Sequence, residues 1–296
     1  MSKILVTGSL GQLGSEIQDL SKFYTNHQFY FFDKDDLDIL DSNKLDSFFE
    51  KNPVDYIINC AAYTAVDKAE EEKELAFLLN HKAVKNLLET SAANNTRLFQ
   101  ISTDYVFGGI HNTPFSEDEK TKPESVYGES KLMGEKAAIE SGRAIVIRTS
   151  WLYSFYGNNF VKTIMKYAQE RDELNVVYDQ VGAPTYAKDL AKAILDIIDK
   201  IERKEKKFEQ GIYHYANEGV LSWFDFATAI TKISNINTKI KAVRSEMFPT
   251  PAKRPPYSVF AKDKIKNTYD IEIPYWRDSL IECIKILEDG NNYLPE

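Results

Sequence analysis

Short apolar runs alternate with longer amphipathic stretches along the first half of the chain. The apolar runs predict β-strands at residues 4–6, 28–32, 54–59, 98–102 and 144–148. Between them, apolar positions recurring every three or four residues predict helices over residues 12–21, 43–51, 74–94 and 127–141. Strands that alternate with helices form a parallel sheet with helices on both faces. The pattern therefore predicts an α/β fold, a Rossmann-like doubly wound parallel sheet.

The pattern changes after about residue 150, where strands become shorter and helical runs are separated by turns. Helices are predicted over residues 160–171, 186–201 and 223–234. The second of these has a single apolar stripe, as expected of a helix that covers the sheet, made of Leu190, Ile194, Leu195 and Ile198. We therefore predict two partly interleaved domains. The larger comprises residues 1–152 and the helix at about 185–201, and the smaller C-terminal substrate domain comprises residues 153–184 and 202–296.

Composition limits the ligands and the setting. A hydrophobic content of 43% in 296 residues is enough for a large core or two modest ones. The net charge of -8 argues against nucleic-acid binding. No apolar run reaches the roughly eighteen residues of a membrane span, and the start of the chain lacks a signal-like segment. We therefore expect a cytoplasmic protein. We also expect no metal site, because its two cysteines and four histidines lack the spacing of ligands.

A glycine-rich turn joins the first predicted strand to the first helix. Gly8, Gly11 and Gly14 form the pattern G-x-x-G-x-x-G there, with Gln12 and Leu13 between the last two. Glycines at such a turn let the backbone approach a pyrophosphate, and the free amides at the helix N-terminus attract its charge. The spacing differs from the commoner G-x-G-x-x-G, but its place between strand and helix predicts dinucleotide binding by all five residues.

Two further segments are expected beside the dinucleotide. Asp33 ends the second strand nineteen residues after Gly14, where an acid can bind the ribose hydroxyls and favour NADH. The adjacent Lys34 could instead attract the 2′-phosphate of NADPH, so the sequence leaves NADPH or NADH open. The third strand is followed by the segment Ala61, Ala62 and Tyr63. Its small residues suit a backbone that passes close to the cofactor, although they could equally be packing residues.

The candidate proton donor is Tyr127, which lies one helical turn before Lys131. On a helix these side chains share one face, so the ammonium can lower the pKa of the phenol from roughly 10 toward working pH. A second Tyr-x-x-x-Lys match, Tyr30 and Lys34, lies on a predicted strand, where four residues span roughly 13 Å. Thr103 ends the fourth strand and can donate a hydrogen bond to a carbonyl oxygen. Together these residues predict a carbonyl reductase with Thr103, Tyr127 and Lys131 as its catalytic residues.

Further motifs carry a family resemblance over nearly the whole chain. They are AAYTAVDKAE (61–70), STDYVF (102–107), YGESK (127–131), RTSWLY (148–153), GNNF (157–160), DQVGAPT (179–185) and TPAKRP (250–255). With these motifs the chain resembles the extended short-chain dehydrogenases/reductases and, among them, the dTDP-4-dehydrorhamnose reductases. The resemblance implies reduction of the 4-keto group of dTDP-4-dehydro-6-deoxy-L-mannose to dTDP-L-rhamnose, with hydride from NADPH or NADH. It also implies a nucleotide-sugar-binding C-terminal domain.

The same resemblance assigns the substrate site. It implies contacts to the dTDP-sugar from Thr64, Asp104, Tyr105, Trp151, Asn159 and Arg254. Taken by itself, Trp151 is typical of a core aromatic and Arg254 of a loop cation, although a guanidinium binds phosphate oxygens through paired donors. Some members of the family form dimers bridged by magnesium through glutamates. Here Glu16 is kept but Lys188 stands where a glutamate is expected, so we predict no metal and leave a homodimer open.

Two other functions remain open from the sequence. The chain could be a related nucleotide-sugar reductase, epimerase or dehydratase on the same fold. Dehydratases usually carry an acid after the Asp of the Thr-Asp motif, where this chain has Tyr105. It could also be a non-catalytic dinucleotide-binding regulatory subunit, since the regulatory β subunit of methionine adenosyltransferase resembles these reductases too.

Overall fold

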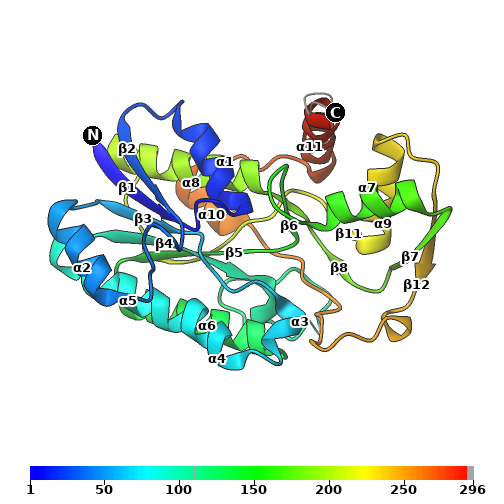
Figure 1. Ribbon diagram of the computed structural model, residues 1–296, viewed down its shortest axis with the longest axis horizontal. Coiled ribbons are helices and arrows are strands. Elements are labelled where there is room, and N and C mark those ends of the chain that lie inside the picture. The colour runs from blue at the N-terminus through cyan, green and yellow to red at the C-terminus, as the bar shows by residue number, and fades with distance from the viewer. Residues whose placement is uncertain (110, 292–296) are drawn as a thin grey trace.

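A six-stranded parallel sheet forms the centre of the molecule in the computed structural model, which describes residues 1–109 and 111–291 (Figure 1). Its strand order is β10-β5-β4-β3-β1-β2, and every neighbouring pair runs parallel. The strands are β1 (Ser2–Thr7), β2 (His27–Phe32), β3 (Tyr56–Asn59), β4 (Arg97–Thr103), β5 (Ala144–Thr149) and β10 (Gly211–His214). The predicted doubly wound α/β fold is confirmed.

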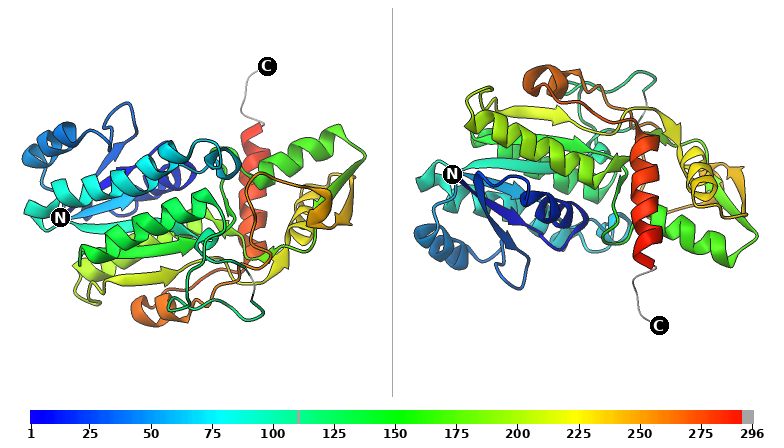
Figure 2. Two further views of the ribbon diagram at one scale, coloured as in Figure 1. Left: turned by 90° about the horizontal axis from the view of Figure 1, so that it is seen from below. Right: turned by 90° about the horizontal axis from the view of Figure 1, so that it is seen from above.

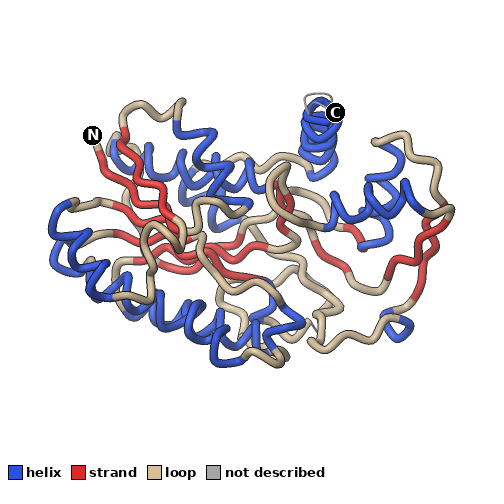
Figure 3. Tube along the Cα trace, in the orientation of Figure 1, coloured by secondary structure: helices blue, strands red, loops and turns tan. Residues whose placement is uncertain are grey.

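Helices cover both faces of this sheet, as Figure 3 shows by the blue coils on either side of the red strands. One face packs against α1 (Gln12–Ser21), α8 (Ala187–Glu202) and α10 (Asp263–Tyr269). The opposite face packs against α2 (Ser42–Lys51), α5 (Ala83–Thr90) and α6 (Val126–Glu140). Because both faces are covered, β3 and β5 are buried along their whole length and carry mostly apolar residues without alternation.

The sheet reverses its winding between β1 and β3. From β1 the chain crosses to β2 on one side, and then returns to β3 on the other side of β1. In an open parallel sheet, such a switch point leaves a crevice outside the carboxyl ends of the two strands, where ligands bind. The glycine turn after β1 and the loop after β3 both open onto this crevice.

The C-terminal residues contribute a second hydrophobic core. It is built mainly from α7 (Phe160–Glu170), α9 (Trp223–Ile233), α11 (Trp276–Asn291), β7 (Glu173–Val177) and β12 (Lys239–Val243). Within the described residues, three two-stranded sheets accompany it: β7 with β12, β6 (Leu152–Tyr153) with β9 (Thr185–Tyr186), and β8 (Val181–Gly182) with β11 (Leu221–Ser222). In both views of Figure 2, α11 stands between the central sheet and the α7 and α9 region. The exact domain boundaries stay a prediction, while α8 does lie against the sheet as the apolar stripe indicates.

The long helix predicted over residues 74–94 is interrupted. The structure has α4 (Lys73–Phe77), a π-helical turn (Leu78–Lys82), α5 and a 3-10 turn (Ala92–Asn94). The π-helical turn contains Asn80, whose buried amide bonds the backbone of Tyr63 in both directions, at 2.9 and 3.1 Å. Helix periodicity does not reveal this bulge, because its reason is a contact with a loop seventeen residues earlier.

The remaining short elements connect these parts. They are α3 (Val66–Ala69) and the 3-10 turns Asp104–Val106 and Ser245–Met247. Among the described residues, no helix has both the length and the apolar character needed to cross a membrane.

Candidate active site

A cavity of about 740 Å³ runs along the carboxyl ends of β1, β3, β4 and β5. It brings together most of the residues proposed from the sequence, although they come from seven separate segments. Those that line it are Gly8, Gly11, Gln12, Leu13, Gly14, Asp33, Ala61, Ala62, Thr64, Thr103, Asp104, Tyr105, Tyr127, Lys131, Trp151 and Arg254. The two that do not line it are Tyr63 and Asn159.

The glycine turn packs closely against the protein's own backbone at the N-terminus of α1. Gly8 has φ +63°, and a Cβ there would lie 2.7 Å from the backbone nitrogen of Ala61. A Cβ on Gly14 would lie 2.3 Å from the Gly8 carbonyl oxygen. Helix α1 begins after Gly11 without a side-chain cap, so its first amides face the cavity instead. This arrangement fits a pyrophosphate, which binds helix N-termini through such amides.

An acid and a cation stand at the end of β2 on the cavity wall. Asp33 accepts a hydrogen bond from the backbone N–H of Leu10 at 3.1 Å and another from that of Lys34 at 2.7 Å. Lys34 lines the cavity next to it. The carboxylate therefore ties the end of β2 to the glycine turn, while the ammonium supplies the positive charge that a 2′-phosphate needs.

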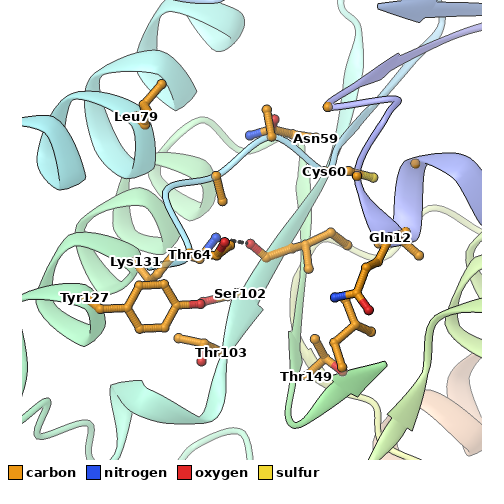
Figure 4. A pocket seen from close by; sticks show the side chains of 18 of the residues that line it. Gln12, Asn59, Cys60, Thr64, Leu79, Ser102, Thr103, Tyr127, Lys131 and Thr149 are labelled. Atoms are coloured by element: carbon orange, nitrogen blue, oxygen red, sulfur yellow. Dashed lines mark hydrogen bonds between the residues drawn. The ribbon is translucent and has the colours of Figure 1, made fainter. Parts of the chain in front are cut away.

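The three proposed catalytic residues meet over the carboxyl end of β4. Tyr127 and Lys131 reach in from α6, whose N-terminus is capped by the Ser125 hydroxyl at 3.2 Å from the Gly128 N–H. Thr103 comes from the end of β4, and Figure 4 shows the three side chains together on one side of the cavity, with Gln12 on the other. The Lys131 ammonium donates to the carbonyl of Ile101 at 2.7 Å.

Burial controls the protonation of Tyr127 and Lys131. It raises the pKa of Tyr127 to about 12, with a smaller contribution from the Asp104 charge, against the opposing contact with the Thr103 hydroxyl. Burial also lowers the pKa of Lys131 to about 8. The pKa of Tyr127 is thus raised, and not lowered as expected from the neighbouring lysine, and desolvation is the largest cause. The phenol stays protonated at neutral pH, which is the form that can donate a proton.

Asp104 holds the Thr103 hydroxyl. It is 3% exposed, and its carboxylate accepts a hydrogen bond from Thr103 Oγ1 at 3.0 Å. Burial raises the pKa of Asp104 to about 6, against hydrogen bonds from Thr103 and Ser258. Thr103 Oγ1 accepts in turn from the backbone N–H of Tyr105 at 3.2 Å. The threonine proton is thus directed at Asp104 until a ligand offers another acceptor.

Arg254 lies on the cavity wall with its guanidinium already partnered. Its Nη1 and Nη2 donate to the two carboxylate oxygens of Asp67 at 3.1 and 2.8 Å. The same carboxylate accepts from the backbone N–H of Ala252 at 3.3 Å. This forked pair fastens the loop around residues 250–256 to α3, and it leaves the other N–H groups of Arg254 for a ligand.

Tyr63 and Asn159 have other contacts. The Tyr63 side chain is 8% exposed, and its hydroxyl donates to Glu72 at 2.7 Å. Asn159 caps α7 by accepting from the Lys162 N–H, and its amide donates to Gln12 Oε1 at 3.0 Å. Asn159 thus contacts Gln12, which lines the cavity, and the direct ligand contacts expected of both residues stay predictions.

Further residues that were not predicted from the sequence also line the cavity. These include Asn59, Ser102, Thr149, Gln180 and Trp223. Asn59 ends β3 and Ser102 is the penultimate residue of β4, so their place at the carboxyl edge is a signal that could have been used. Gln180 and Trp223 come from the C-terminal part; Gln180 lies in the motif DQVGAPT (179–185), whereas no local pattern points to Trp223.

The residues at the positions of the family's magnesium bridge are partnered within the chain. Glu16 accepts a hydrogen bond from the Ser154 hydroxyl at 2.5 Å, and Lys188 forms an ion pair with Glu282. Burial raises the pKa of Glu16 to about 6. Within residues 1–109 and 111–291 no group of three or more His, Cys, Asp or Glu side chains is placed to hold a metal ion.

A doubly wound sheet, a glycine turn at its switch point and a helical Tyr-Lys pair beside the same cavity define a dinucleotide-binding enzyme of the short-chain dehydrogenase/reductase type. Sequence comparison makes the assignment narrower. The family described as RmlD substrate binding domain matches residues 2–288, and the chain belongs to this family.

Its relatives include dTDP-4-dehydrorhamnose reductases. The chain is 37% identical to that of Aggregatibacter actinomycetemcomitans, over 95% of this chain and 97% of the relative. It is 36% identical to the spore coat polysaccharide biosynthesis protein SpsK of Bacillus subtilis, over 96% and 98%.

Solved structures agree with this family. A dTDP-4-dehydrorhamnose reductase from Clostridium acetobutylicum superposes with a TM-score of 0.90 at 41% identity, covering 97% of this chain and 99% of the other. One from Bacillus anthracis, in complex with NADP, gives 0.89 at 36% identity, covering 96% and 99%. The resemblance stated from the motifs is confirmed.

Proposed function

We propose that this chain is a dTDP-4-dehydrorhamnose reductase, which reduces the 4-keto group of dTDP-4-dehydro-6-deoxy-L-mannose to give dTDP-L-rhamnose. The observation that carries the proposal is the meeting of Tyr127, Lys131 and Thr103 beside a turn that fits a dinucleotide. NADPH or NADH, when bound, supplies the hydride to the carbonyl carbon. The NADP complex of the Bacillus anthracis relative supports this choice of cofactor.

The chain's own residues handle the proton. Tyr127 donates its phenolic proton to the carbonyl oxygen as that oxygen becomes an alkoxide, which is a stronger base than a phenolate. The Lys131 ammonium lies on the same face of α6 and stabilises the phenolate that remains. Thr103 turns its hydroxyl from Asp104 to the carbonyl oxygen, or it accepts a hydrogen bond from the phenol while its own hydroxyl proton stays hydrogen-bonded to Asp104.

The other residues proposed from the sequence are assigned to binding. Gly8, Gly11, Gln12, Leu13, Gly14, Asp33, Ala61, Ala62 and Tyr63 belong to the proposed dinucleotide site. Thr64, Asp104, Tyr105, Trp151, Asn159 and Arg254 belong to the proposed nucleotide-sugar site. All of them come from one chain, so the same chemistry serves a monomer or a homodimer. A cytoplasmic location is part of the proposal, because the reaction consumes free NAD(P)H.

The test is a coupled assay that makes the keto-sugar in situ, compares NADH with NADPH, and identifies the product sugar. The Tyr127→Phe variant should lose about 10²–10⁴-fold in turnover, the usual contribution of a general acid. Tyr30→Phe is the matched control, since it removes the tyrosine hydroxyl of the other Tyr-x-x-x-Lys match, and Tyr30 lies on β2. Wild-type turnover in Tyr127→Phe would refute the proposed acid.

The alternatives give other results in the same assay. An epimerase or dehydratase would convert a nucleotide sugar without net consumption of NAD(P)H. A regulatory subunit would show no turnover on any keto-sugar and would be recovered with a stoichiometric enzyme partner.

A further inference from the structure

Trp151 adopts a backbone conformation that bulky residues avoid. It has φ +49° and lies between the end of β5 and the start of β6. The chain turns there from the central sheet into the short β6/β9 sheet. A glycine would make this turn without steric cost, whereas an aromatic residue in the left-handed region is an outlier. Such strain persists where surrounding contacts enforce it, and it concentrates at functional sites.

Two neighbours hold the Trp151 indole. The ring of Trp223 stacks on it with centroids 3.6 Å apart and planes at 11°. On the side of β8, a Cβ added to Gly182 would lie 2.9 Å from the Trp151 ring atoms Cε2 and Cζ2. Glycine at position 182 therefore lets the backbone touch the indole, and Trp223 stacks against the same ring. Both tryptophans line the cavity and are only partly buried.

This pair lies close to the proposed catalytic residues. The Cβ position of Gly182 is also 2.6 Å from Ser258 Oγ, and Ser258 is hydrogen-bonded to Asp104. The Asp104 carboxylate in turn accepts a hydrogen bond from the Thr103 hydroxyl. A continuous set of contacts thus links Trp151 and Trp223 to Thr103, which lies beside the proposed proton donor. A sugar whose carbonyl meets Thr103 and Tyr127 would lie against this aromatic wall.

We propose that Trp223 is a positioning residue that holds the strained Trp151 indole as one wall of the sugar subsite. This inference rests on the proposed function, and it gives Trp223 a task in the binding of the sugar. Aromatic faces suit the C–H-rich face of a deoxysugar, and they offer no hydrogen bond to the diphosphate or the dinucleotide. Removal of the stack should therefore weaken binding of the sugar and leave binding of NAD(P)H unchanged.

A purely structural role for Trp223 makes a different prediction. Its ring also contacts Phe160, with centroids 4.5 Å apart, at the edge of the C-terminal core. If packing were its only task, replacement would lower stability and leave both KM values unchanged. Trp276 serves as the matched control, because it packs in the same core and does not line the cavity.

The experiment compares Trp223→Leu, Trp223→Phe and Trp276→Phe in the coupled assay. We expect Trp223→Leu to raise KM for the keto-sugar about tenfold, since aromatic pairs contribute up to a factor of this order. Trp223→Phe keeps a stacked ring and should restore most of the loss, and Trp276→Phe should leave both KM values unchanged. An unchanged KM for the keto-sugar in Trp223→Leu, or an equal rise for NAD(P)H, overturns the proposal.

The Gly182→Ala variant tests the position of the Trp151 indole from the side of β8. It stays informative even if Trp223→Leu fails to fold. The added methyl would meet both Ser258 Oγ and the Trp151 indole, and displacement of the indole should raise the same KM. A Gly182→Ala protein with wild-type KM for the keto-sugar would contradict the proposal. If wild type itself fails to reduce the keto-sugar, the proposed function is wrong instead, so the two failures are distinct.

Ligand binding gives a second readout without turnover. The chain has three tryptophans, so Trp276→Phe leaves the stacked pair as the only tryptophans, which can be excited selectively over the tyrosines. Titration of this variant with dTDP-L-rhamnose should change its fluorescence more than titration with dTDP, which lacks the sugar. Equal responses to dTDP and dTDP-L-rhamnose would place the sugar elsewhere and overturn the inference.

Discussion

The replacement of Lys131 by methionine should make the protein more stable at neutral pH while removing activity. Lys131 is 4% exposed on α6, and its ammonium has the Ile101 carbonyl as its hydrogen-bond acceptor at 2.7 Å. Burial lowers the pKa of this group from 10.5 to about 8, although the Glu135 carboxylate and the Cys60 thiol oppose that effect. Folding at pH 7 therefore requires an ammonium ion to leave water.

The structure sets the size of this cost. A pKa lower by about 2.5 pH units (10.5 minus 8), at 1.36 kcal/mol per unit, makes the buried charge cost about 3 kcal/mol at pH 7. Methionine removes the charge and fills similar space, but it leaves the Ile101 carbonyl without its donor, which costs about 1–2 kcal/mol. We expect Lys131→Met to raise the free energy of unfolding by about 1–2 kcal/mol at pH 7.

The gain should depend on pH with a definite sign. The pKa of Lys131 is lower in the folded state than in the unfolded state. The free-energy cost of burying its charge in wild type is therefore absent above about pH 10.5. It grows as the pH falls from there, and it is complete below about pH 8. Near pH 10.5 the variant retains only the loss of the hydrogen bond, so its advantage should disappear.

Urea unfolding of wild type and Lys131→Met at pH 7, 9 and 10.5 measures this difference. Lys136→Met is the matched control, because Lys136 is exposed on the same helix. A Lys131→Met protein that is no more stable than wild type at pH 7 would refute the reasoning. So would a gain of equal size at all three pH values, since only a titrating charge produces the dependence. A confirmed gain would mean that the proposed active site is kept at the expense of stability.

Two further substitutions test the two ends of the cavity. Gly14→Ala places a Cβ 2.3 Å from a carbonyl oxygen of the glycine turn, so it should abolish NAD(P)H binding, measured by quenching of protein fluorescence, while dTDP still binds. Asp67→Asn weakens the forked pair with Arg254, so KM for the nucleotide sugar should rise roughly three- to tenfold, as expected for loss of a charge-assisted hydrogen bond, with KM for NAD(P)H unchanged. An unchanged KM for the nucleotide sugar in Asp67→Asn would mean that the pair has no part in binding.

The fold could be predicted from the sequence because its signals are local. Strands buried on both faces are continuous apolar runs, and the five strands predicted from them lie within or beside the observed ones. The glycine turn was predicted from its place between a strand and a helix. β10 was missed, although it completes the sheet beside β5, because its four residues have no pattern distinct from a loop.

Much of the candidate site followed from the same logic. Parallel strands end at one edge, so residues that follow strands, such as Asp33 and Thr103, are expected to share a cavity. Tyr127 and Lys131 needed only the helix period. The family motifs then brought in Trp151 and Arg254, which no pattern of strands and helices would have placed at the cavity.

The sequence by itself determined which residues meet at the sheet edge, since helix and strand periods fix the direction of side chains over a few residues. The tertiary structure decided what those residues can do. It buried Tyr127 enough to raise its pKa rather than lower it, paired Arg254 with Asp67, and stacked Trp223 on Trp151. Desolvation and pairing depend on every atom that surrounds a group. Those atoms come from segments up to 187 residues apart, so no local pattern records them.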